Sequence, residues 1–109
     1  MGMIVGVVDK MPLSPIDCAH LVVDVASDKL ASDIVMLDLR GVSNLTDFFV
    51  IITAESSRQI EGLVADVEDA VKKEGGRLHH REGSAQGGWV LLDFSDVITH
   101  ILRPEEREF

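Results

Sequence analysis

Apolar and polar positions follow two different periods along this chain, and each change of period predicts a new element. Apolar residues spaced three and four apart from Cys18 to Ala26 form one face of a helix, which we expect at about 15–30. Ser14 can cap the free amides at its start, and Pro15 suits the first helical position because no hydrogen bond is lost there. The first element is therefore an amphipathic helix.

A longer apolar stripe with the same spacing, from Ile60 to Val71, predicts a second helix. Ser56 and Gln59 precede it as a capping box, in which each side chain satisfies an amide at the helix start. The glycine pair 75–76 ends the pattern. This is the most regular pattern in the chain.

Continuous apolar runs between the two helical patterns are too short for helices. The run 34–39 predicts a strand that is buried on most of both faces, and 48–53, rich in β-branched and aromatic residues, predicts another. The link between them, with turn residues at 41–44, is short, so we expect antiparallel pairing.

The last third of the chain predicts three more strands. Segment 77–82 carries many charges, which is typical of an exposed edge strand, and 83–88 then reads as a flexible loop. Segments 89–94 and 97–102 predict two strands joined by a tight hairpin at Ser95-Asp96. Pro104 ends the last strand, and a charged tail follows it.

The order of elements is helix, two strands, helix, three strands. This order predicts an α/β (α+β) fold in which helices cover a mixed five-stranded sheet. Residues 1–13 fit no clear element and are a short strand or a disordered extension, whereas 14–109 are expected to form a single domain.

Charge and cysteine content narrow the class of function. The 109 residues include 10 Lys and Arg against 19 Asp and Glu, so the formal net charge is −9. Such a chain is poorly suited to non-specific nucleic-acid binding and favours a basic protein as a charged partner. The single cysteine excludes a disulfide framework, and no apolar run is long enough to span a membrane. We therefore expect a cytoplasmic protein, or an organellar one whose targeting segment is absent.

Three polar residues interrupt the apolar strands: Asp38, Asp93 and His100. Buried charged groups are costly unless they are paired, so these residues are either functional or placed on the solvent face. Asp93 and Asp96 could together hold a divalent cation, but Ser-Asp is also ordinary chemistry for a hairpin turn. The turn is the favoured interpretation.

Other candidate residues have simpler structural explanations. His79 and His80 are adjacent on a strand and point to opposite faces, so they cannot easily share one ion. Cys18 lies among apolar helix positions and is expected to be a buried core residue. Trp89, the only tryptophan, is either a core anchor or an interface hot spot. The chain has no phosphate-binding glycine motif, and we expect no cofactor or metal ion.

Three stretches, taken in order, are similar to the Iojap family of ribosomal silencing factors. They are Val35-Met36-Leu37-Asp38-Leu39-Arg40-Gly41 with Thr46-Asp47-Phe48-Phe49-Val50-Ile51, then Ser56-Ser57-Arg58-Gln59-Ile60, and finally Glu82-Gly83, Trp89 to Ile101 and Glu106-Arg107. Each motif alone is weak, but together they cover about two-thirds of the chain in unbroken order. Where the family pattern continues with tyrosine and a Leu-Glu-x-Leu-Trp segment, this sequence has Phe109 and ends.

The resemblance implies a non-enzymatic translation factor with a fold similar to the nucleotidyltransferase layer. Such a factor binds the large ribosomal subunit through ribosomal protein L-fourteen, prevents subunit joining, represses translation and often forms homodimers. The residues that the resemblance places at or near the partner are Trp89, Val90, Leu92, Asp93, Asp96 and His100. Strand alternation nevertheless puts Val90 and Leu92 on the face opposite Trp89.

An enzymatic alternative remains open from the residues alone. A nucleotidyltransferase-type enzyme would use Asp93, Asp96 and Asp38 to hold Mg²⁺, with Gly83-Ser84 as the turn ahead of the acids. No basic cluster follows these residues to neutralise a triphosphate. A dimeric scaffold with another protein partner is a third hypothesis.

Overall fold

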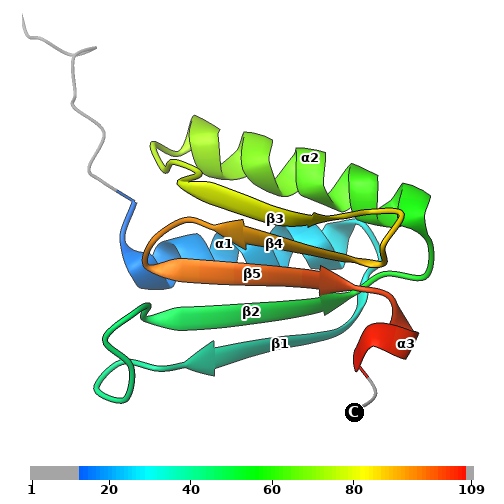
Figure 1. The fold of residues 1–109 in the computed structure, drawn as a ribbon. Coiled ribbons are helices and arrows are strands. Elements are labelled where there is room, and N and C mark those ends of the chain that lie inside the picture. The colour runs from blue at the N-terminus through cyan, green and yellow to red at the C-terminus, as the bar shows by residue number, and fades with distance from the viewer. Residues whose placement is uncertain (1–12, 108–109) are drawn as a thin grey trace, which may run out of the picture.

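The computed structural model describes residues 13–107, which form a five-stranded sheet with two long helices on one of its faces (Figure 1). Residues 1–12, nearly all of the predicted extension, lie outside the described part, as do residues 108–109. The elements in chain order are α1 (Pro15–Asp28), β1 (Ser32–Asp38), β2 (Phe48–Thr53), α2 (Ser57–Lys73), β3 (His80–Ser84), β4 (Trp89–Asp93), β5 (Val97–Leu102) and the short α3 (Pro104–Arg107).

The sheet is mixed, and its strand order is β1-β2-β5-β4-β3. β1 and β2 pair antiparallel, as the short link predicts, and β4 and β5 form the predicted hairpin. β2 pairs with β5 in parallel, which the long crossover through α2 permits. The predicted fold class, an α+β domain with a mixed five-stranded sheet, is confirmed.

Both long helices begin with the predicted caps. The Ser14 hydroxyl accepts a hydrogen bond from the Asp17 amide at 3.2 Å, and the Ser56 hydroxyl accepts one from the Gln59 amide at 3.1 Å. The capping box is shifted by one residue, because the Gln59 carboxamide oxygen accepts from the amide of Glu55, at 2.7 Å, and not from that of Ser56. The caps therefore fix both helix starts.

The hydrophobic core lies between the helices and one face of the sheet. α1 packs over β1 and β2, α2 packs over β4 and β5, and the two helices contact each other. Both helices turn the predicted apolar stripes toward the sheet. Fully buried sheet residues that face these helices are Phe48, Val50, Ile52, Val90, Leu92, Val97, Thr99 and Ile101.

The prediction that β1 is buried on most of both faces is wrong. β1 is an edge strand, and Val35 and Leu37 are 36% and 40% exposed. A continuous apolar run is typical of a central strand. In β1 one set of apolar side chains, Ile34 and Met36, packs against the core, while the alternate set lies on the face turned away from α1 and α2.

The C-terminal third differs from prediction in two details. β3 is an exposed edge strand, as expected, but it runs over His80–Ser84, so Gly83 and Ser84 belong to the strand and not to the loop. The charged tail after Pro104 forms the single helical turn α3. No helix within residues 13–107 is long and apolar enough to cross a membrane.

Candidate functional site

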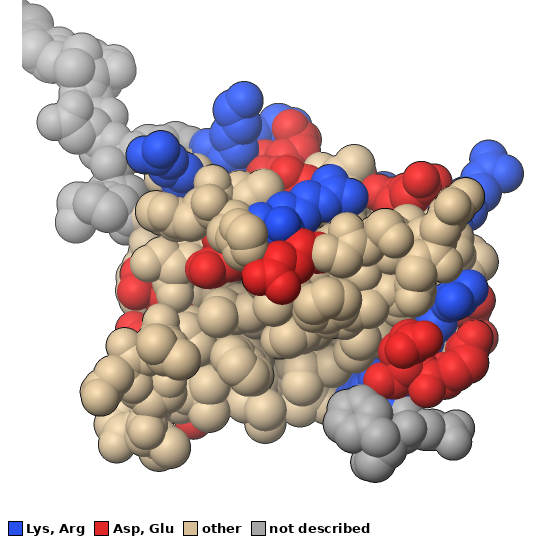
Figure 2. All heavy atoms as spheres, viewed as in Figure 1, with Lys and Arg blue, Asp and Glu red and all other residues tan. Residues whose placement is uncertain are grey.

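Across β1, β2, β5 and β4 the sheet face opposite the long helices is mainly apolar, and no long helix of residues 13–107 covers it (Figure 1). We call it the open face. Register places on it the alternate side chains of four neighbouring strands, which are Val35, Leu37, Phe49, Ile51, Trp89, Leu91, Ile98, His100 and Leu102. In Figure 2 the middle of this face carries no charged side chain, and the charges gather along the α2–β3 edge and around α3. Exposed contiguous apolar area of this kind marks an interaction surface.

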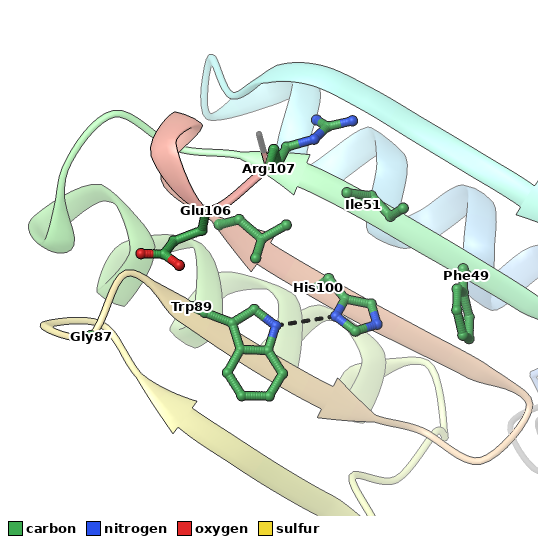
Figure 3. A pocket seen from close by; sticks show the side chains of 8 residues that line it. Phe49, Ile51, Gly87, Trp89, His100, Glu106 and Arg107 are labelled. Carbon is green, nitrogen blue, oxygen red and sulfur yellow. Dashed lines mark hydrogen bonds between the residues drawn. The ribbon is translucent and has the colours of Figure 1, made fainter. Parts of the chain in front are cut away.

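A hydrogen bond between Trp89 and His100 lies near the centre of the open face (Figure 3). The indole Nε1 donates to His100 Nδ1 at 3.2 Å, and the two rings lie 6.3 Å apart at an angle of 29°. The Phe49 ring meets the imidazole from the other side in a T-shaped arrangement, with ring centroids 5.4 Å apart. An indole N–H only donates, so Nδ1 must be unprotonated, and the neutral imidazole carries its proton on Nε2. His100 thus fixes the orientation of the Trp89 ring.

Beside these rings the open face forms a shallow hollow of about 650 Å³. Ile51 of β2 and Leu102 of β5 line it together with Phe49 and His100, and the Trp89 ring forms one wall. Glu106 and Arg107 of α3 close one end. The hollow combines an apolar lining with charge at one end, which is the composition of a binding pocket for an amphipathic group.

Arg107 connects α3 to strands β1 and β2 through two hydrogen bonds. Its Nη1 donates to the backbone oxygen of Asp33 and to the hydroxyl of Thr53, each at 2.6 Å. Asp33 lies near the beginning of β1 and Thr53 is the last residue of β2, so both acceptors are far from Arg107 in sequence. The arginine therefore holds the end of the hollow in place.

Two of the six predicted contact residues are excluded by their burial. Val90 and Leu92 are fully buried beneath α2, so their assignment to the partner surface is wrong. Strand alternation already separates them from Trp89, but only the position of the helices decides which face is covered. Trp89 and His100 lie together on the open face.

Asp93 and Asp96 belong to the β4–β5 turn. The Asp93 carboxylate accepts from the Ser95 amide at 2.7 Å, and the Asp96 amide donates to the Phe94 carbonyl at 3.1 Å. This confirms the turn interpretation. Asp93 borders the open face beside Ile98, and Asp96 is exposed at the turn.

The remaining polar candidates have local partners. Asp38 accepts from the Arg40 guanidinium at 2.7 and 3.0 Å, and these bonds lower the pKa of its carboxyl group. His80 Nε2 lies 2.8 Å from a Glu82 oxygen on the exposed edge. Within residues 13–107, no three His, Cys, Asp or Glu side chains gather at a place that could hold a metal ion.

Cys18 is buried, as predicted, on the side of α1 that packs into the core. Burial raises the pKa of its thiol to about 11, with a smaller contribution from the charge of Asp96. A thiol with this pKa is almost fully protonated at neutral pH, and it is therefore a poor nucleophile.

Of the residues that line the hollow, only Trp89 and His100 were predicted to belong to a site. Phe49, Ile51 and Leu102 carry a usable signal, because they alternate along their strands with fully buried neighbours. Glu106 and Arg107 belong to the stretches that resemble the family, but no local pattern places them at the hollow, since the turn of α3 and the contact with Asp33 depend on tertiary structure. The hollow therefore becomes visible only when the sheet is assembled.

The pH dependence of stability should report on His100. Burial lowers the pKa of its imidazole below the ordinary 6.5. As the pH falls below 6.5, the unfolded chain binds the proton before the folded chain does, so the free energy of unfolding decreases until the pH passes the folded pKa.

We therefore expect that, when the pH is lowered from 7.5 to 5, the melting temperature of His100→Gln decreases less than that of the native chain. Glutamine does not titrate and keeps an acceptor for the Trp89 indole. Thermal unfolding followed by circular dichroism measures the difference. Parallel losses in the two proteins would contradict a contribution from His100.

The fold and the open face together define the class: a small α+β domain with one sheet face covered by helices and the other apolar and uncovered. The family model described as "Ribosomal silencing factor during starvation" matches residues 12–109. The chain belongs to this family of ribosomal silencing factors.

Individual relatives agree with this assignment. The Ribosomal silencing factor RsfS of Halalkalibacterium halodurans is 31% identical over 90 residues, which are 83% of this chain and 77% of the relative. The chloroplastic protein Iojap of Zea mays is 36% identical over 84 residues, 77% of this chain and 36% of that protein. A crystal structure of a Chromobacterium violaceum protein superposes with a TM-score of 0.83 at 28% identity, covering 88% of this chain and 80% of the other.

Proposed function

We propose that this chain represses translation by binding the large ribosomal subunit through ribosomal protein L-fourteen and obstructing the small subunit. The observation that carries the proposal is the apolar open face around Trp89. Family membership supports a ribosomal role, and several relatives are named ribosomal silencing factors. The open face supplies the contact area that such a role needs.

The charge of the chain supports a protein partner on the ribosome. With a net charge of −9, the domain is repelled by ribosomal RNA and attracted to a basic protein patch within it. Apolar area at the centre and charges at the edge match the usual division of a protein interface. In this proposal Trp89 and His100 provide the central contact, and the carboxylates of Asp93 and Asp96, at the β4–β5 turn, contribute acidic groups at its rim.

The proposed action is steric and involves no chemical step. A bound domain of this size occupies space on the subunit face that the small subunit would otherwise contact. Repression then follows from competition, so an excess of small subunits should relieve it. The side chains act only by holding the domain in place.

Sedimentation with separated ribosomal subunits tests the proposal. We expect the protein to sediment with large subunits and not with joined ribosomes, and to lower the yield of joined ribosomes when it is added before mixing. Absence from the large-subunit fraction, or full subunit joining at saturating protein, would refute the proposal. The homodimer that the resemblance implies stays a prediction, and the mass of the free protein in the same centrifuge tests it.

A further inference from the structure

We propose that the hollow beside Trp89 binds one arginine side chain of the basic partner, with Glu106 as its counter-ion. This inference rests on the proposed function, because it assigns a recognition element to the same open face. It concerns the part of the hollow between the Trp89 ring and α3.

The lining of the hollow suits the stem of a long side chain. Ile51 and Leu102 present aliphatic groups from adjacent strands, and Phe49 extends this apolar lining along β2. Arginine buries its methylene stem along such surfaces and keeps its charged head at the edge. A short or fully polar side chain would leave this lining exposed to water.

The Trp89 wall favours a cation. Tryptophan gives the strongest cation–π attraction of the aromatic residues, and a planar guanidinium can also stack on it. The hydrogen bond to His100 holds the indole in one orientation, so little conformational freedom is lost when a guest stacks against it.

Charge at the end of the hollow gives the cation a partner. Figure 3 shows the two charged side chains of α3 pointing in opposite directions, Arg107 toward β1 and β2 and Glu106 toward the β3–β4 side. Arg107 is already bound to Asp33 and Thr53. The Glu106 carboxylate has no ion-pair or hydrogen-bond partner among residues 13–107. A carboxylate at the end of an apolar hollow accepts two parallel N–H bonds from arginine.

The same helical turn contains a matched control. Glu105 follows Pro104 one residue before Glu106, does not line the hollow and lies 3.8 Å from the Arg103 guanidinium. Glu105→Gln and Glu106→Gln remove the same charge from neighbouring positions. If the attraction were only a general electrostatic one, the two variants would lose the same affinity for large subunits. The proposed contact predicts that only Glu106→Gln loses substantial affinity.

Affinity for purified large subunits is the first measurement. We expect Glu106→Gln to bind about tenfold more weakly than the native chain, and Glu105→Gln to lose about twofold or less. The difference in affinity between the native chain and Glu106→Gln should decrease as the salt concentration is raised, because salt screens the ion pair that only the native chain can form. Equal losses in the two variants would overturn the arginine contact while leaving the silencing function intact.

A titration without ribosomes tests the hollow independently. The probe is N-acetyl-arginine methylamide, and the readout is the NMR signal of the Trp89 indole N–H, the only indole in the chain. We expect this signal to shift at millimolar concentrations of the probe. The shift should be smaller in Glu106→Gln, whereas in Glu105→Gln it should equal that of the native chain. The uncharged N-acetyl-norleucine methylamide should shift it less. Equal response to both probes would overturn the proposal, even if the chain still binds large subunits.

Discussion

Trp89→Ala should weaken binding to large ribosomal subunits by about 2 kcal/mol or more, or about thirtyfold. The substitution removes the wall of the hollow and the donor of the hydrogen bond to His100. Trp89 is only half-buried, on the sheet face turned away from α1 and α2, so the core beneath these two helices should remain packed. Sedimentation at graded subunit concentrations measures the affinity, and circular dichroism verifies the fold.

Val42→Ala provides a control for loss of exposed apolar area. Val42 is 83% exposed in the loop between β1 and β2 and does not line the hollow. We expect its affinity to stay close to that of the native chain. If folded Trp89→Ala protein bound large subunits as tightly as the native chain, Trp89 would have no place in the interface.

Leu92→Ala should lower the free energy of unfolding by about 2–5 kcal/mol, the usual cost of a leucine-sized cavity in a packed core. Leu92 is fully buried beneath α2. Leu91, its neighbour on β4, lies half-buried on the open face, opposite His100 in the register. Leu91→Ala should destabilise the fold less, because it leaves no enclosed cavity.

Substitutions at the two leucines should affect different properties of the protein, ribosome binding at Leu91 and stability at Leu92. We expect Leu91→Ala to weaken large-subunit binding, and Leu92→Ala to bind normally at temperatures where it remains folded. Urea unfolding measures stability, and sedimentation measures binding. A stable Leu92→Ala protein with lost binding would reverse the assignment of the two sheet faces.

Elements with strong local signals were predicted closely. α2 has a five-residue core stripe, a capping box and terminal glycines, all within one stretch of chain. β2 was predicted at its observed bounds, and the β4–β5 hairpin at its observed turn. Each of these depends on interactions between residues close in sequence, where propensity and periodicity are reliable.

Two predictions that depended on position within the sheet were wrong, namely the burial of β1 and the exposure of Val90 and Leu92. The run at β1 has the composition of a central strand, yet its place at the edge leaves Val35 and Leu37 exposed. Strand alternation separates Val90 and Leu92 from Leu91, but alternation does not determine which of the two sheet faces is covered. Their roles differ only because α2 lies on one side of β4.

For this protein the sequence by itself determined the class of fold, the helix starts, the two faces of each strand and the family resemblance. Tertiary structure alone decided which faces the helices cover, and it brought Glu106 and Arg107 to the hollow beside Trp89. The physical reason is that alternation is a property of the local backbone, whereas burial depends on contacts between distant segments, such as that of Arg107 with Asp33.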